Sequence, residues 1–219
     1  MTFSILARDA ETGEIGAAVA TGTPAVGGFV LHALPGVGAL ATQGYSTNTL
    51  YGPRGLRLLE DGLPASEVCR RLTFEDAGRD WRQLLVIDAQ GRTGGWTGEK
   101  NVAPMQHHSA PDLAVAGNWL GAEKVVPAMR AAYLAHRAEP MMPRLFAALE
   151  AGEAAGSDSR GVQSAAALVI ATDRPPISLR VDLDAQPIAR LREIHAATGD
   201  PDFRAFLDRL PRLSDPARR

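Results

Sequence analysis

Two segments built from glycine and alanine place the strongest constraint on how this chain folds. Residues 15–20 read Ile-Gly-Ala-Ala-Val-Ala, and residues 165–167 are three alanines. Side chains this small let a second layer of backbone pack close against a strand. We therefore expect both segments to lie on the inner faces of two stacked sheets.

Hydrophobic periodicity alternates between strand-like and helix-like blocks along the chain. The alternating pattern predicts strands at 2–8, 15–20, 37–43, 81–88, 93–97, 112–116, 162–172 and 177–183. Helical spacing predicts two helices in 51–72 on either side of Asp61-Gly62, a second pair at 121–137 and 143–155, and two more at 187–197 and from 200 onward. The glycine-rich segment 22–38 is expected to be irregular, and Pro127 should kink or shorten its helix.

The order of these blocks predicts an α+β fold. Hairpins, rather than strand-helix-strand units, join neighbouring strands, so the sheets should be antiparallel, and each helix pair can cover the outer face of one sheet. We expect a four-layer α/β/β/α sandwich of two antiparallel sheets. No repeat or linker interrupts the sequence, which predicts one domain at 1–210, with a core at 2–183, C-terminal helices at 187–210 and a frayed tail at 211–219.

Composition excludes several classes of partner. The 219 residues include 23 Lys and Arg against 25 Asp and Glu, and the basic residues are scattered, which argues against a nucleic-acid partner. No apolar run is long enough to span a bilayer, so we expect no membrane partner. A single cysteine, Cys69, and the lack of a signal-like leader at residues 1–5 predict a cytoplasmic protein. Sandwiches of this type often pair, which suggests a homodimer by analogy.

Familiar catalytic motifs are missing, and we predict neither a bound metal nor a cofactor. The sequence contains no Gly-x-Ser-x-Gly, Gly-x-x-x-x-Gly-Lys-Ser/Thr, His-Glu-x-x-His or Gly-x-Gly-x-x-Gly motif. His107 and His108 are adjacent and should point in opposite directions, so we interpret them as part of a surface loop. Cys69 neighbours two arginines that could lower its pKa, but a helix cysteine of this kind is usually a packing residue.

Thr2 is the remaining candidate for chemistry. Initiator methionine is removed when the next residue is small, and removal of Met1 would give Thr2 a free α-amine with a pKa of about 7.7–8.0. That amine can take the proton of the threonine hydroxyl and activate it for acyl transfer. The competing interpretation is that Thr2 is an ordinary β-branched residue at the head of a strand.

Seven ordered blocks of sequence resemble the DUF1028 family. They are Thr-Phe-Ser-Ile-Leu-Ala-Arg-Asp-x-x-Thr-Gly-Glu-x-Gly at 2–16, Ala-Thr-Gln at 41–43, Tyr-Gly-Pro-Arg-Gly-Leu at 51–56, Asp-Ala-Gln-Gly-Arg at 88–92, Thr-Gly at 97–98, Gly-Asn-x-Leu at 117–120 and Asp-x-Arg-Gly-x-Gln-Ser-Ala-Ala at 158–166. The family is similar in fold to the N-terminal nucleophile (Ntn) hydrolases. The resemblance therefore implies that the first strand block carries a nucleophile, and that nucleophile would be Thr2.

Comparison with Ntn hydrolases also implies partners for Thr2. Asn118 precedes the second helix pair and would donate to an oxyanion, whereas Asp158 and Ser164 follow it and would hold the amine and relay a proton. Arg160 would bind a substrate carboxylate through its guanidinium fork. The resemblance adds Gln43 and Gln163 as substrate-binding residues. On the alternative reading, residues 158–161 are a turn with a surface ion pair.

The expected activity is an N-terminal-nucleophile amidohydrolase that cleaves an amide or other C–N bond of a small, anionic substrate. Proteasome-type sites use a lysine on an early strand, whereas the first lysine of this chain is Lys100. The α-amine of Thr2 itself must therefore be the base, and retention of Met1 would block the chemistry. The alternative is a non-catalytic Ntn-fold protein that binds a small anionic ligand or a protein partner.

Overall fold

The computed structural model describes residues 1–157 and 161–219, and their strands form two antiparallel sheets. The six-stranded sheet has the order β10-β9-β2-β1-β8-β7, and the four-stranded sheet has the order β3-β4-β5-β6. The strands are β1 Thr2–Arg8, β2 Ile15–Thr21, β3 Leu31–Leu34, β4 Gly38–Gln43, β5 Gln83–Asp88, β6 Thr93–Thr97, β7 Gln106–Ala110, β8 Leu113–Asn118, β9 Ser164–Ala171 and β10 Arg174–Val181. The predicted α+β class with two antiparallel sheets is confirmed.

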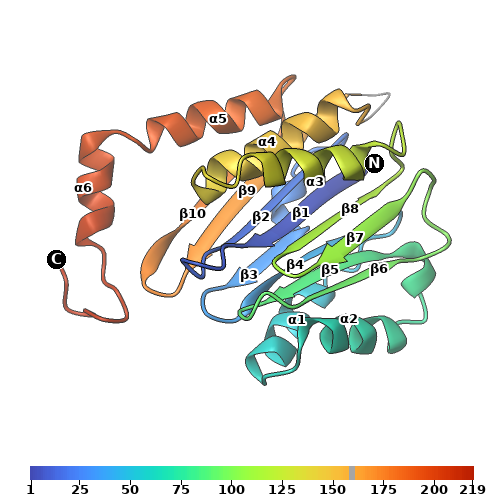
Figure 1. The fold of residues 1–219 in the computed structure, drawn as a ribbon, viewed down its shortest axis with the longest axis horizontal. Coiled ribbons are helices and arrows are strands. Elements are labelled where there is room, and N and C mark those ends of the chain that lie inside the picture. Colours follow the sequence, from blue (N-terminus) through green and yellow to red (C-terminus); the bar gives the residue numbers. More distant parts are fainter. Residues whose placement is uncertain (158–160) are drawn as a thin grey trace.

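Two helix pairs lie against the two sheets, as Figure 1 shows. Helices α1 (Tyr51–Glu60) and α2 (Ala65–Phe74) pack on the four-stranded sheet, and α3 (Val125–Ala135) and α4 (Met141–Ala154) pack on the six-stranded sheet. Helix α5 (Pro187–Ala197) runs beside α4, whereas α6 (Pro201–Arg209) turns away from the rest of the chain (Figure 1). Pro127 is the third residue of α3, which begins later than predicted.

Strand parity divides the buried core into layers. Leu6, Ala17 and Leu85 belong to a cluster between the two sheets, and their neighbours along each strand face the helices. The alanine- and glycine-rich strands are therefore buried on both faces, and not only on the inner face that we predicted. A Cβ on Gly16 would lie 2.7 Å from the side chain of Met141 and 3.0 Å from that of Leu145, so α4 packs closely over this glycine.

Two predicted local structures are wrong. The segment 22–38 is not wholly irregular, because it contains strand β3, which pairs with β4. His107 and His108 lie on strand β7 at the edge of the six-stranded sheet, and not in a loop, because residues 106–110 pair with β8. Strands β3 and β7 both lie at the edge of a sheet, where a strand needs less apolar surface than a central one. Neither segment therefore has the long alternating apolar pattern from which a strand is predicted.

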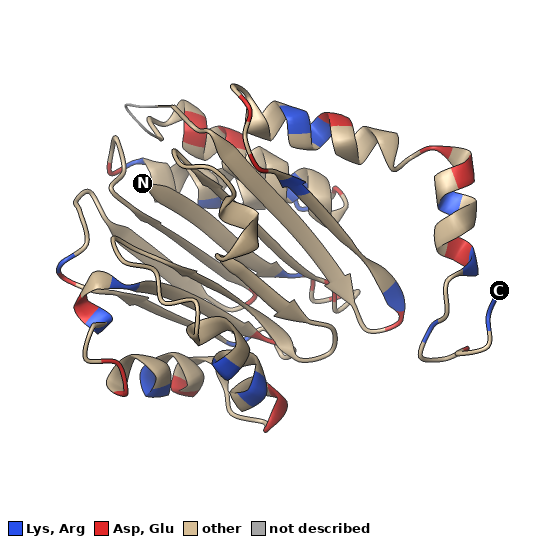
Figure 2. Ribbon diagram, turned by 180° about the vertical axis from the view of Figure 1, so that it is seen from behind, with Lys and Arg blue, Asp and Glu red and all other residues tan. Residues whose placement is uncertain are grey.

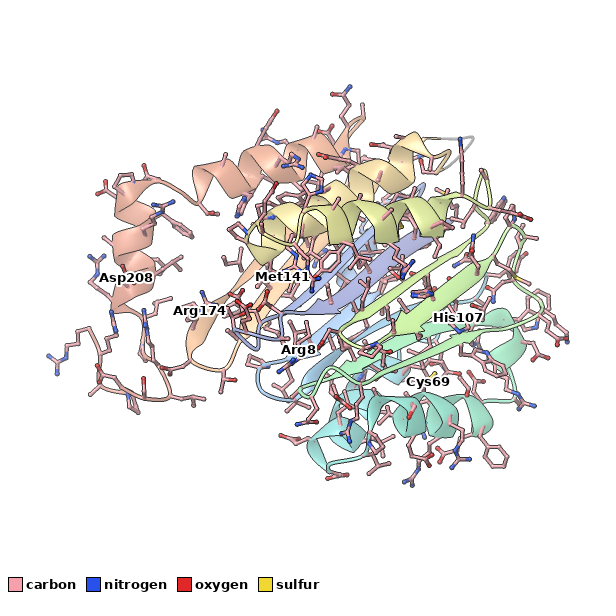
Figure 3. The ribbon with its side chains drawn as sticks, viewed as in Figure 1. Arg8, Cys69, His107, Met141, Arg174 and Asp208 are labelled. Atoms are coloured by element: carbon pink, nitrogen blue, oxygen red, sulfur yellow. The ribbon has the colours of Figure 1, made fainter. Side chains whose placement is uncertain are left out.

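Charged side chains lie mainly on the helices and at the ends of strands, and the strands themselves are mostly uncharged (Figure 2). Cys69 lies between α2 and the four-stranded sheet, where burial raises the pKa of its thiol to about 12, so it is a packing residue (Figure 3). In the described part of the chain, no helix is long and apolar enough to cross a bilayer. No three His, Cys, Asp or Glu side chains among those residues are grouped as metal ligands.

Candidate functional site

A row of polar side chains crosses one end of the six-stranded sheet. Asn118 lies opposite Thr2, Thr2 lies opposite Thr21, and Thr21 lies opposite Ser164, on the neighbouring strands β8, β1, β2 and β9. Each of the four has the same parity as the residues of its strand that face the four-stranded sheet, so all four side chains point toward that sheet. The fold thus brings together residues from both ends of the sequence.

Two glutamines of the four-stranded sheet meet this row from the other side. Gln43 ends β4 and Gln83 begins β5, where they are paired, and both are almost completely buried. The Gln43 amide nitrogen donates to the Gln83 side-chain oxygen at 2.6 Å and to the carbonyl oxygen of Thr2 at 3.3 Å. The side-chain oxygen of Gln43 is buried without a protein partner. An unsatisfied acceptor at this depth calls for a water or a ligand donor.

Gln83 is the centre of the hydrogen-bond network between the sheets. Its side-chain oxygen accepts from Gln43 and also, at 3.1 Å, from the amide nitrogen of Asn118. Its own amide nitrogen lies 2.9 Å from the Thr97 hydroxyl and 3.0 Å from the carbonyl oxygen of Gly117. This arrangement sets the orientation of the Asn118 amide and leaves the second N–H of that amide for another acceptor.

A cavity of about 240 Å³ opens beside Thr2. Its described lining contains no charged side chain and consists of Met1, Thr2, Thr21, Thr23, Phe29, Gly44, Tyr45, Thr47, Val102, Asn118 and Trp119. The hydroxyl groups of Thr2 and Thr21 lie 3.1 Å apart, so the Thr2 hydroxyl is held at the edge of this cavity. Hydroxyls and amides can bind and orient a polar group, but none of them is a base at neutral pH.

Met1 is part of the packed structure next to Thr2. Its side chain is 6% exposed and belongs to the cluster between the six-stranded sheet and its helices. The Thr21 hydroxyl donates a hydrogen bond to the Met1 carbonyl oxygen as well as contacting the Thr2 hydroxyl. In this form of the protein the nitrogen of Thr2 is a peptide nitrogen, so a free α-amine exists only after Met1 is removed.

The structure brings some of the sequence-predicted residues together. Asn118 lies directly opposite Thr2, as predicted, and Gln43 contacts the Thr2 backbone. Ser164 lies in the same row but two strands away, where its hydroxyl donates to the Thr23 carbonyl at 2.5 Å and accepts from the Val26 N–H at 3.2 Å.

Three further predicted residues follow α4. Gln163 binds the Thr21 carbonyl oxygen through its backbone N–H at 2.8 Å. Asp158 and Arg160 lie outside the described residues.

Sequence reasoning missed three residues of the site. Thr21 lies on the same face of its strand as Ala17 and Val19, and Gln83 lies on the same face as Leu85. In both strands a polar residue therefore interrupts an otherwise apolar, inward-facing row, and this was the signal available in the sequence. Trp119 follows Asn118, and no feature of the sequence predicts its left-handed backbone.

Comparison with known proteins agrees with this architecture. A family model described as "Family of unknown function (DUF1028)" matches residues 2–191. The chain belongs to the DUF1028 family. The search of curated proteins found no match.

Solved structures include a close relative of this DUF1028 chain. A DUF1028 protein from Silicibacter pomeroyi is 38% identical, with a TM-score of 0.93, and the match covers 99% of this chain and 98% of that one. An Anbu (ancestral β-subunit) protein from Yersinia bercovieri gives a TM-score of 0.41 at 13% identity, over 95% of this chain and 98% of the other. The row that contains Thr2, Thr21, Asn118 and Ser164 lies within the matched DUF1028 region.

Proposed function

We propose that this DUF1028 protein is an Ntn-type hydrolase, with an α/β/β/α sandwich fold, that cleaves an amide or other C–N bond through Thr2. One observation carries the proposal: the Thr2 hydroxyl lies at the edge of a cavity of about 240 Å³, at the head of a central strand and next to Asn118. A nucleophile needs both an open approach for the substrate and a nearby donor for the developing oxyanion. Thr2 has both.

The reaction would begin once Met1 has been removed. The α-amine of Thr2 takes the hydroxyl proton as the oxygen attacks the carbonyl carbon, and a tetrahedral intermediate forms with its negative charge on the former carbonyl oxygen. The protonated amine then gives its proton to the leaving nitrogen as the C–N bond breaks. Water, activated by the same amine, attacks the resulting ester of Thr2 and releases the carboxylic acid.

Asn118 is suited to the oxyanion role because one of its amide N–H groups is held by Gln83 and the other is directed by that bond. Ser164 is proposed to relay a proton, and its distance of two strands from Thr2 means that a water molecule or Thr21 must connect them. Asp158, Arg160 and Gln163 keep their proposed roles of holding the amine and binding a small anionic substrate.

A second candidate function is non-catalytic binding of a small ligand in the same cavity. The observation that favours it is the position of Met1, whose side chain is buried in the core and whose carbonyl accepts the Thr21 hydroxyl. A protein that retains this methionine has no free amine at Thr2 and no base at that position.

Intact mass of natively produced protein separates the two candidates. A mass that lacks Met1, together with hydrolysis of acyl p-nitroanilides, supports the enzyme. Thr2→Ala should abolish this turnover, and Thr2→Ser should keep part of it, because serine retains the hydroxyl. Thr21→Val is the matched control, since it removes a neighbouring hydroxyl without removing the nucleophile, and it should keep measurable turnover. Turnover that persists undiminished in Thr2→Ala, or in protein that retains Met1, would reject the mechanism.

A further inference from the structure

The geometry points to a substrate class for the cavity beside Thr2: we infer that it binds a molecule with a flat aromatic ring, held between Tyr45 and Trp119, whose amide reaches Thr2. The binding part of this inference stands without any catalysis, and only the part about turnover rests on the proposed function. Three observations support it: the residues that line the cavity, the way that each ring is presented, and the size of the cavity.

Aromatic side chains are concentrated in this cavity. Phe29, Tyr45 and Trp119 are three of the eleven described residues that line it, although aromatic residues make up only 5% of the sequence. The cavity at the other end of β1 has one aromatic lining residue, Tyr133, and the cavities beside β10 and α6 have none. Aromatic faces bind other rings by offset or edge-to-face packing.

Tyr45 is held at the mouth of the cavity with most of its side chain in solvent. It follows Gln43 and Gly44, and its backbone N–H donates to the Asn101 side-chain oxygen at 2.8 Å. Its ring centroid lies 5.3 Å from that of Trp81 at an interplanar angle of 45°. Tyr45 is nevertheless 60% exposed, so its position is fixed while one side of the ring remains accessible.

Trp119 reaches the same cavity from the other sheet. It directly follows Asn118 and has a φ of 53°, a left-handed conformation that is unfavourable for a bulky residue. Its N–H donates to the Val102 carbonyl at 2.6 Å, which holds the backbone there, and its side chain is 44% exposed. Strained backbone that presents a large apolar side chain to solvent is characteristic of functional sites. Trp119 therefore directly follows one residue of the polar site, Asn118, and Tyr45 lies two residues after another, Gln43.

The volume of the cavity fits one ring together with an amide. A cavity of about 150 Å³ is enough to hold benzene, and this one is about 240 Å³. The hydroxyl groups of Thr2 and Thr21 line the end of the cavity next to Asn118, where they can meet the polar part of the molecule. A short aryl amide thus matches both parts of the lining.

The test is a binding measurement with phenylacetamide as the aromatic probe and propanamide as the aliphatic probe. It uses the Thr2→Ala protein, which cannot turn over either amide, and ligand-observed NMR or calorimetry. We expect phenylacetamide to bind at least about tenfold more tightly than propanamide. Tyr45→Leu and Trp119→Gly should each remove most of that preference. Phe74→Leu, which changes a 75% exposed aromatic residue on α2, should leave it intact.

The outcomes separate this inference from the proposed function. Equal binding of the two amides, tighter binding of N-acetylglucosamine than of phenylacetamide, or an unchanged preference in Tyr45→Leu would overturn the aromatic assignment. Aromatic preference without any turnover by the wild-type protein would support the inference and reject the enzyme. Turnover of aliphatic and aryl amides at the same rate would support the enzyme and reject the aromatic assignment. A thermal melt of each variant checks that it is folded, and Trp119→Gly suits this purpose because glycine adopts a positive φ readily.

Discussion

The two ends of strand β1 are built from opposite chemistry. At the Thr2 end the described lining of the cavity has no charged side chain. At the Arg8 end, labelled in Figure 3, a cavity of about 230 Å³ lies among ion pairs: Arg8 contacts Asp112 at 3.1 Å, and Arg144 contacts Asp9 at 3.0 Å. The two cavities are nearly equal in volume, but charged side chains line the one at the Arg8 end and are absent from the described lining of the one at the Thr2 end.

This difference between the two ends of β1 distinguishes residues that stabilise the fold from residues to which we assign a function. Four charged side chains at the Arg8 end form the two ion pairs, and the Arg144 guanidinium lies 4.4 Å from the Tyr133 ring. The left-handed residue there is Asp112, a type that tolerates a positive φ. One atom, the Arg144 Nε, is buried without a partner. The Thr2 end instead combines an unpaired Gln43 oxygen, a left-handed tryptophan and exposed rings. Features that cost stability gather at the end where we place the function.

The largest effect on stability is expected at the Arg8 end. Arg144→Met removes a nearly buried cation and leaves Asp9 without its partner, so it should lower the free energy of unfolding by about 3 kcal/mol. Arg190→Met is the control, because its pair with Glu193 is exposed and should contribute less than about 1 kcal/mol. Urea denaturation measures both. Binding of phenylacetamide should be unchanged, and a large change in it would show that the two ends are coupled.

A smaller loss should follow from breaking the network at the Thr2 end. Gln83→Leu leaves the buried amide donors of Gln43 and Asn118 without their acceptor, which should cost about 2 kcal/mol of stability. It should also reduce turnover, because the Asn118 amide loses its orientation. Gln90→Leu, in an exposed turn, should change stability by less than about 0.5 kcal/mol. A Gln83→Leu protein as stable and active as wild type would contradict the central role of Gln83 in this hydrogen-bond network.

Asp76 makes the stability of the Thr2 end depend on pH. Burial raises the pKa of this carboxyl, but hydrogen bonds from Asn48, Tyr51 and Arg82, among others, outweigh burial and lower the pKa to about 2. These bonds fix the loop that carries Tyr45. The folded pKa lies below the unfolded value of about 3.9, so the stabilisation is complete above about pH 4 and is lost as the pH falls toward 2.

The variant Asp76→Asn tests this dependence. At pH 7 it should lower the free energy of unfolding by about 1.5 kcal/mol, because charge-assisted hydrogen bonds are replaced by neutral ones. The difference from wild type should shrink between about pH 4 and pH 2 in urea titrations. Asp61→Asn, at the exposed end of α1, is the control and should show little difference at any pH. A difference for Asp76→Asn that does not change with pH would contradict the assignment.

The smallest effect concerns the backbone of Trp119. Trp119→Gly should be more stable than Trp119→Ala by about 1 kcal/mol, because alanine is penalised at a φ of 53°. At Arg57, an exposed position in α1, the same pair should give the opposite order by a similar amount. Thermal melts of the four variants measure both differences. If alanine is the better residue at position 119 as well, the strain argument for this site fails.

Much of the local structure could be predicted because the signals are local. The β1–β2 hairpin follows from alternation and from a turn in which Asp9 accepts the N–H groups of Glu11 and Thr12. Strand β7 could not be predicted, because Gln106–Ala110 has no apolar alternation and becomes a strand only through pairing with β8. Gln83 could be predicted from sequence through its parity, but its central place in the hydrogen-bond network depends on partners from four other strands.

Apart from β3 and β7, the sequence by itself determined where the strands and helices lie. It also determined which residues of a strand share a face, because alternate side chains of any strand point the same way. Only the tertiary structure decided which strand ends meet. The order β9-β2-β1-β8 places Asn118 and Ser164 in one row with Thr2, although long stretches of chain separate them. Pairing between distant strands depends on the packing of the whole core, and no local pattern encodes it.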